Sequence, residues 1–209
     1  VLLVGSANYE DGETTGASVQ VYDFATDKVA DAVPAADASV GPLALGDLHG
    51  DGNLDLFVGG RLKAGKYPEG VNSRIFRNQV GTFVLDETNS KVVEAVGMVS
   101  AAVFSDLDGD GFPELILACE WGPLRVFHND RGLLASWNLP LSLSVSSNCA
   151  PHLTGPPLKT LDQLTGWWNG VTTGDLDGDG RLDIIASNWG ENSKYNSHRA
   201  APLRLYFAD

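Results

Sequence analysis

The stretch Asp106-Leu107-Asp108-Gly109-Asp110-Gly111-Phe112-Pro113-Glu114 decides the fold, because it is one copy of an acidic, glycine-rich pattern, D-x-x-G-D-G-x-x-[D/E]. The pattern recurs at residues 47–55 (DLHGDGNLD) and 175–183 (DLDGDGRLD). Each copy stands between two short apolar runs that have the composition of β-strands. Three copies in one context indicate a repeated structural unit rather than three unrelated turns.

The segments around the loops predict four short strands in each repeat. A first strand precedes the loop (residues 41–46, 98–104 and 170–174), and a second follows it (54–58, 115–119 and 184–187). A third begins with an arginine, an aliphatic residue and an aromatic residue (74–78, 125–129 and 204–207), and a fourth follows a tight glycine turn (81–85 and 132–137). Three further strands are expected at residues 1–6, 18–23 and 28–32, and no helical periodicity is evident.

This periodicity predicts an all-β fold, a β-propeller fragment with four-stranded blades, because a sandwich lacks such a repeat. Two blades are complete, 41–86 and 97–137, and two are partial, 1–32 and 169–209. Residues 138–168 form a long insertion. A closed propeller needs about four to eight blades, so we expect a fragment of a larger ring or an open half-ring.

The composition fits a folded, acidic chain. Hydrophobic residues make up 43% of the 209 residues, and the net charge is −13. This charge argues against nucleic acid or an anionic membrane as a partner. No apolar run approaches the roughly 18 residues of a membrane-spanning helix. Both ends fall within strand patterns, so we expect any targeting segment to lie outside this sequence. Of the 27 acidic residues, eleven lie in the three loops, which is the charge expected of metal sites.

The two cysteines carry less information. Cys119 lies in the apolar run 115–119 and is expected to be a buried free thiol. Cys149 lies in the insertion, in a segment rich in serine and proline. A disulfide between them is an alternative, but two cysteines do not make a disulfide framework.

The loops are expected to bind calcium. Alternating carboxylates on a tightly curled loop converge, glycines allow the positive φ angles of the curl, and Ca²⁺ prefers six to eight oxygen ligands. The simpler alternative is ordinary Asp-Gly turn chemistry, which three equivalent copies make improbable. The candidate ligands occupy loop positions 1, 3, 5, 7 and 9, with position 7 contributing its backbone carbonyl: Asp47, His49, Asp51, Asn53 and Asp55; Asp106, Asp108, Asp110, Phe112 and Glu114; Asp175, Asp177, Asp179, Arg181 and Asp183.

Two other kinds of metal site are excluded by spacing and residue type. An EF-hand needs a bidentate glutamate at position 12, where this chain has Val58, Leu117 and Ala186. Zinc favours cysteine and histidine, but the loops contain no cysteine and one histidine. Because that residue, His49, replaces an aspartate at position 3, we expect the first loop to bind calcium most weakly of the three.

The pattern resembles the FG-GAP/VCBS repeats, as in the propeller of the integrin α-subunit. The stretches GRLKAGKYPEG (60–70), EWGPLRVFHND (120–130) and GWWNGVTTGDLDGDGRLDIIASNWG (166–190) are similar to bacterial and animal proteins that carry an ASPIC/UnbV domain after such repeats. The resemblance implies a seven-bladed type of propeller, calcium in the loops between the first and second strands, and an extracellular, periplasmic or cell-surface location.

The long connections of this arrangement are predicted on the face opposite the calcium loops. These connections are residues 61–73, 86–97, 138–169 and 188–202. Four tryptophans lie in these connections or close to them: Trp121, Trp167, Trp168 and Trp189. Exposed aromatic rings on loops of a rigid scaffold suit a protein or carbohydrate ligand. The alternative is that these tryptophans pack between blades.

Three functions compete on this evidence. The first is a non-catalytic binding or adhesion module, stabilised by up to three Ca²⁺ ions. The second is a polysaccharide lyase or hydrolase, for which Arg61, Glu120, Glu191 and His198 are the candidate groups. The third is a structural spacer in a longer chain. No Ser-His-Asp arrangement or phosphate-binding glycine loop is found, and the fold alone does not decide between the three.

Overall fold

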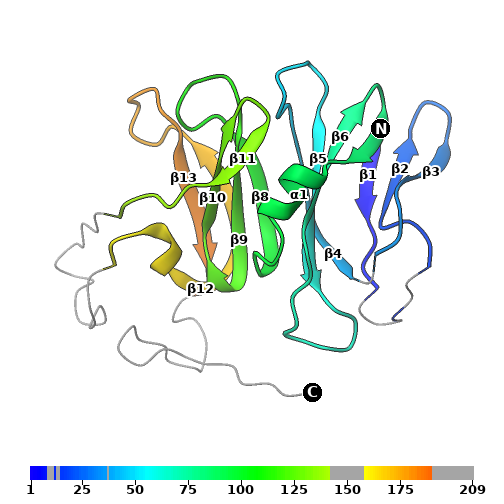
Figure 1. Ribbon diagram of the computed structural model, residues 1–209, viewed down its shortest axis with the longest axis horizontal. Coiled ribbons are helices and arrows are strands. Elements are labelled where there is room, and N and C mark those ends of the chain that lie inside the picture. The colour runs from blue at the N-terminus through cyan, green and yellow to red at the C-terminus, as the bar shows by residue number, and fades with distance from the viewer. Residues whose placement is uncertain (9–11, 13–14, 37, 142–157, 190–209) are drawn as a thin grey trace.

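The computed structural model describes residues 1–8, 12, 15–36, 38–141 and 158–189, which form antiparallel β-sheets (Figure 1). The first sheet contains β1 (Leu2–Gly5), β2 (Val19–Asp23) and β3 (Lys28–Val33). The second contains β4 (Ser39–Gly46), β5 (Asp55–Leu62), β6 (Arg74–Gln79) and β7 (Thr82–Leu85). The third contains β8 (Met98–Ser105), β9 (Glu114–Pro123), β10 (Arg125–Asp130), β11 (Leu133–Ser136), β12 (Thr165–Gly174) and β13 (Asp183–Asn188). This mostly β architecture confirms the predicted fold class and is consistent with propeller blade fragments.

The three acidic loops have the same place in the strand register. In each, the last residue of the loop pattern pairs with the residue before the loop: Gly46 with Asp55, Ser105 with Glu114, and Gly174 with Asp183. The β4–β5, β8–β9 and β12–β13 connections all lie at the upper end of Figure 1, whereas the β5–β6 connection lies at the lower end. The loops are therefore equivalent corners on one end of the stacked sheets.

Apolar layers between neighbouring sheets form the core. Along β5 the side chains alternate, as the strand period requires: Leu56 and Val58 face the first sheet with Val19, and Phe57 faces the third sheet with Leu115. Within the third sheet, a further apolar cluster contains Trp168 of β12 and Ile116 of β9. Strands β4 and β8, and β8 and β12, also contact each other. The sheets thus stack face to face, as propeller blades do.

Two features differ from the sequence expectation. Residues 86–97, predicted as a loop, contain a short helix, α1 (Glu87–Val92), whose N-cap Asp86 accepts a hydrogen bond from the Asn89 amide at 3.0 Å. Six residues are too few to show a helical period, and the cap is the signal that was missed. In addition, β12 pairs with the end of β9, so Thr165 lies opposite Pro123, and this pairing joins two predicted blades into one sheet. Among the described residues, no helix is long and apolar enough to cross a bilayer.

Cys119 is a buried free thiol, as expected, whereas Cys149 lies outside the described residues. Burial raises the pKa of the Cys119 thiol to about 11, and the thiolate is the reactive form. We therefore expect iodoacetamide at about pH 8 to leave Cys119 unmodified in the folded chain and to modify it fully in urea. Mass spectrometry of a Cys149→Ser variant isolates the signal of Cys119. Rapid labelling of the folded variant would contradict its burial.

Candidate metal centres

The first aspartate of each loop organises the turn. Asp106 accepts hydrogen bonds from the amides of Gly109, Asp110 and Gly111 at 2.8, 3.1 and 3.0 Å. Asp175 accepts the three equivalent bonds in the third loop at 2.8–3.2 Å. The six loop glycines, Gly50, Gly52, Gly109, Gly111, Gly178 and Gly180, have φ between +66° and +90°. The positive φ angles expected of a curled loop are therefore present in all three copies.

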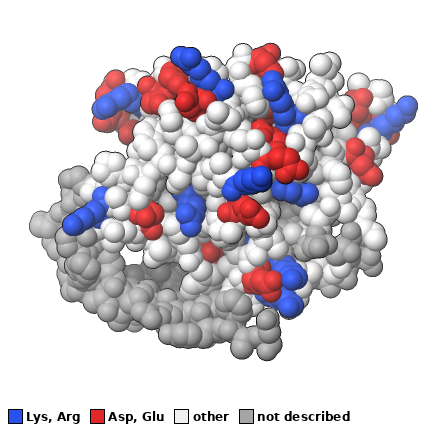
Figure 2. All heavy atoms as spheres, viewed as in Figure 1, with Lys and Arg blue, Asp and Glu red and all other residues white. Residues whose placement is uncertain are grey.

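Two of the loops gather three carboxylates closely enough to share one ion. Asp106, Asp108 and Asp110 each place an oxygen within 4.8 Å of the others. In the third loop the close group is Asp175, Asp177 and Asp183, at positions 1, 3 and 9, so Asp179 at position 5 is not part of it. Figure 2 shows acidic side chains crowded at this end of the molecule. These groups offer only oxygen donors, which is the donor chemistry that a hard cation such as Ca²⁺ prefers.

The residue at position 9 has a structural role that the pattern does not reveal. Glu114 is fully buried, and its carboxylate accepts hydrogen bonds from the amides of Leu107 at 2.8 Å and Asn129 at 3.3 Å. Asp55 is also buried and accepts from the amides of Leu48 at 3.2 Å and Asn78 at 2.8 Å. A carboxylate at position 9 therefore joins the loop to the third strand of the repeat, which is β6 for Asp55 and β10 for Glu114.

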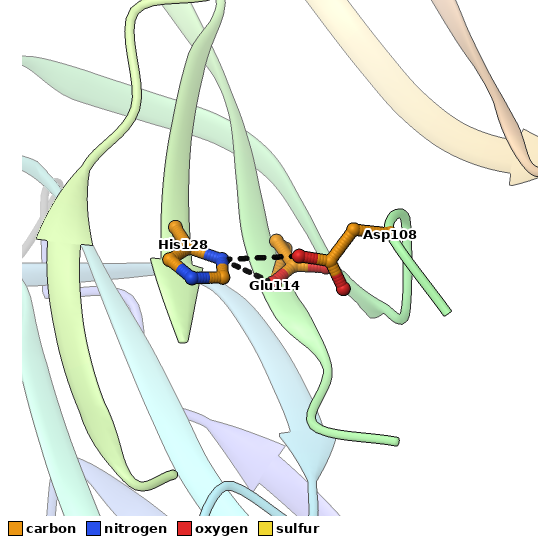
Figure 3. Close-up of side chains that lie close together, drawn as sticks. All are labelled: Asp108, Glu114 and His128. Atoms are coloured by element: carbon orange, nitrogen blue, oxygen red, sulfur yellow. Dashed lines mark hydrogen bonds and ion pairs between the residues drawn. The ribbon is translucent and has the colours of Figure 1, made fainter. Parts of the chain in front are cut away.

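His128 places a ring nitrogen beside two carboxylates of the second loop. Its Nδ1 lies 3.0 Å from Glu114 and 3.5 Å from Asp108, and these three residues form a further group able to hold a metal (Figure 3). The ring comes from β10, Glu114 from the start of β9, and Asp108 from the loop. In the sequence, His128 is distinguished only by its place in the third strand of the repeat.

The first loop is arranged differently. Asp51 forms an ion pair with Arg77 at 3.0 Å, and His49 Nδ1 lies 2.7 Å from Asp55. The amide and side chain of Asn53 together with Arg77 lower the pKa of Asp51 to about 2. Among the described residues, this loop supplies no group of three close metal-ligating atoms. The arrangement supports the prediction that this loop binds calcium most weakly.

The residues at position 7 differ in what their side chains do. Arg181 binds the Asp179 carboxylate at 2.5 Å, and this contact holds the pKa of Asp179 below its usual range. Asn53 donates to Asp51 at 3.0 Å. The ring of Phe112 packs closely against Gly50 of the neighbouring loop. A Cβ atom placed on Gly50 would lie 2.9 Å from this ring. The side chains thus support their own or adjacent loops, and the metal-binding role of the backbone carbonyls stays a prediction.

Two asparagines were missed by sequence reasoning. Asn78 and Asn129 are the penultimate residues of β6 and β10. Each accepts a hydrogen bond at 2.7 Å from the glycine amide of the following turn, at Gly81 and Gly132. Asn129 also donates to the carbonyls of Pro113 at 3.2 Å and Leu48 at 3.0 Å. The repeated motif R-I-F-R-N and R-V-F-H-N, at residues 74–78 and 125–129, was the available signal.

The tryptophans divide into two groups. Trp168 is buried, 8% exposed, and its indole donates to the Leu164 carbonyl at 3.1 Å, so the packing alternative holds for this residue. Trp121, Trp167 and Trp189 instead contact one another, with ring centroids 4.9 and 4.4 Å apart. They lie near the end of β9, the start of β12 and the end of β13, at the end opposite the acidic loops (Figure 1).

Comparison with known proteins agrees with this repeat. The family described as FG-GAP-like repeat matches residues 47–117 and 106–186, and each match begins at the first aspartate of an acidic loop. Together the two matches span residues 47–186, which is more than half of the 209-residue chain. No curated protein matches the sequence.

Proposed function

The chain belongs to the FG-GAP-like repeat family, and from this premise we propose that it is a calcium-binding propeller segment that acts as an extracellular binding or adhesion module. The observation that carries the proposal is the repeated loop geometry. The second and third loops each gather three carboxylates within 4.8 Å at the same end of the sheets. Calcium would fix these corners and leave the opposite end to a protein or carbohydrate partner.

We also propose a location outside the cytoplasm, on the cell surface or in a periplasm, because of the expected strength of the sites. Calcium sites of extracellular modules have dissociation constants of about 10⁻⁴–10⁻³ M, which suffice only where calcium is abundant. The carboxylates here are largely exposed at the loops, and exposed ligands give weak sites. An extracellular module is thus the setting in which these loops would be occupied.

The catalytic alternative receives less support. Glu120 is 5% exposed, and its carboxylate already pairs with Arg61 and accepts a hydrogen bond from Tyr67. A general acid or base must instead reach the substrate proton. Glu191 and His198, the other candidates, lie outside the described residues. Repeats of this family are usually non-catalytic, so we propose a binding role rather than an enzymatic one.

Calorimetric titration with Ca²⁺ tests the metal assignment. We expect Asp110→Asn and Asp177→Asn each to remove one binding event, because each belongs to a close group of three carboxylates. Asp51→Asn should leave both events, because Arg77 already neutralises Asp51. Calcium at about 2 mM should stabilise the fold by about 0.6–1.8 kcal/mol for each site with a dissociation constant of about 10⁻⁴–10⁻³ M.

Thermal unfolding in EDTA measures that contribution independently. No heat of binding together with an unchanged melting temperature in EDTA would reject calcium. Equal losses of affinity in the Asp51→Asn and Asp110→Asn variants would reject the ranking of the loops.

A further inference from the structure

A continuous row of three indole rings lies at the end of the sheets opposite the acidic loops. Trp167 is in the middle, with Trp121 tilted against it by 37° at 4.9 Å and Trp189 edge-on at 4.4 Å. Trp189 is 43% exposed. The rings come from or adjoin three separate strands, β9, β12 and β13. Contacts between these strands, rather than one flexible loop, therefore hold the row in place.

A polar network adjoins the row. The indole nitrogen of Trp121 donates to the hydroxyl of Tyr67, which donates to Glu120 at 2.6 Å. Arg61 forms an ion pair with the other oxygen of Glu120. The second terminal nitrogen of Arg61 is buried and has no hydrogen-bond partner among the described residues. A buried donor without an acceptor is rare and calls for an explanation.

Local irregularities orient two of the rings. Trp121 has φ of +60°, a left-handed conformation that costs a non-glycine residue about 1–2 kcal/mol. The β12–β9 ladder shifts register between Gly166 and Trp167, and such bulges redirect side chains. Strain of this kind persists where the surrounding structure enforces it, often at ligand sites. Trp168, the next residue along, is simply buried in the core.

We propose that Trp121, Trp167 and Trp189, with Tyr67, Glu120 and Arg61, form a binding platform for a neutral carbohydrate chain, a proposal that specifies the partner of the binding module proposed above. The apolar faces of pyranose rings stack on aromatic surfaces, and their hydroxyl groups need nearby donors and acceptors, which this network supplies. A ligand oxygen that reaches past Tyr67 would provide the acceptor that Arg61 lacks.

The charge of the platform favours a neutral ligand. Arg61 and Glu120 neutralise each other, so the network has no net charge with which to attract a phosphate or an acidic polymer, and the whole chain carries −13. A peptide ligand would be expected to insert its side chains into pockets. The contiguous indole rings are better matched to a row of sugar rings.

Tryptophan fluorescence and calorimetry with cellohexaose, laminarihexaose, mannohexaose and chitohexaose, in calcium buffer, test the proposal. We expect at least one of these oligosaccharides to shift the emission and release heat, and Trp189→Ala to weaken that binding tenfold or more. Trp189→Phe should retain most of the affinity, because an aromatic face remains. Phe24→Ala is the matched control, since Phe24 is 67% exposed in the connection between β2 and β3, and it should bind as the parent chain does.

Three outcomes are decisive. Unchanged affinity in Trp189→Ala, with an unchanged melting temperature, would overturn the assignment of the site. If none of the four oligosaccharides binds while the calcium titration is normal, the carbohydrate proposal is overturned. Immobilised collagen and fibronectin then separate the two proposals: calcium-dependent binding to either would preserve the adhesion function with a protein partner, and binding to neither would count against both.

Discussion

Glu114→Gln is expected to lower the free energy of unfolding by about 2–4 kcal/mol, measured by urea denaturation in EDTA so that no metal contributes. The glutamine has the same shape but must turn its NH₂ group toward a donor. One carboxylate oxygen of Glu114 accepts the Leu107 amide, and the other accepts the Asn129 amide and lies 3.0 Å from His128. At least one backbone N–H group, buried at Asn129 or half-buried at Leu107, therefore loses its acceptor.

Asp183→Asn is the matched control for that variant. It occupies position 9 of the third loop and accepts the Leu176 amide at 2.8 Å, but it is only half-buried, so water can replace the lost bond. Its expected cost is about 1 kcal/mol. Equal losses for the two variants, or a loss below about 1 kcal/mol for Glu114→Gln, would show that burial of this carboxylate does not stabilise the blade.

The strands and the loop geometry could be predicted because they depend on local signals. Two-residue hairpins follow β6 and β10, with positive φ at both turn residues in each: Val80 and Gly81, and Arg131 and Gly132. Glycine at the second position of each turn is the sequence signal that predicted the two hairpins. The six loop glycines likewise predicted the tightly curled backbone of the acidic loops. Signals of this kind involve only a few neighbouring residues, and three copies strengthened them.

The burial of individual polar residues could not be predicted in the same way. Period-two alternation puts Trp167 and Trp168 on opposite faces of β12, but it does not say which face a neighbouring sheet covers. The sequence likewise shows acids at positions 1, 5 and 9 without showing that Asp55 and Glu114 point inward. These outcomes depend on contacts between blades, and the contacting residues are distant in the sequence.

The same distinction applies to the candidate sites. Repetition drew attention to the carboxylates of the loops, and the structure brings those of the second and third loops together. The contact between His128 and Glu114 joins two strands of one blade. The network of Arg61, Tyr67 and Glu120 joins the second sheet to the third. Neither arrangement recurs in the part of the chain that the structure describes, so the pattern that identified the fold could not identify them.

Asn129→Ala is expected to destabilise the chain by about 3–5 kcal/mol, because two buried backbone groups and a half-buried one lose their partners at once. Its side chain is fully buried, donates to the carbonyls of Leu48 and Pro113, and accepts the Gly132 amide. The bond to Leu48 crosses from the third sheet to the loop of the second, so the variant should loosen the interface between blades as well as the turn.

Asn78→Ala provides the comparison, since Asn78 holds the equivalent place in the preceding blade. Its side chain bonds the Leu54 carbonyl and the Gly81 amide in exposed positions, and we expect a cost of about 1 kcal/mol. Asn129→Asp should be at least as damaging as alanine, because its carboxylate would face the carbonyls of Leu48 and Pro113. If urea denaturation gave equal losses for Asn78→Ala and Asn129→Ala, the contact between blades through Leu48 would contribute nothing measurable. A tolerated Asn129→Asp would contradict the hydrogen-bond directions on which the prediction rests.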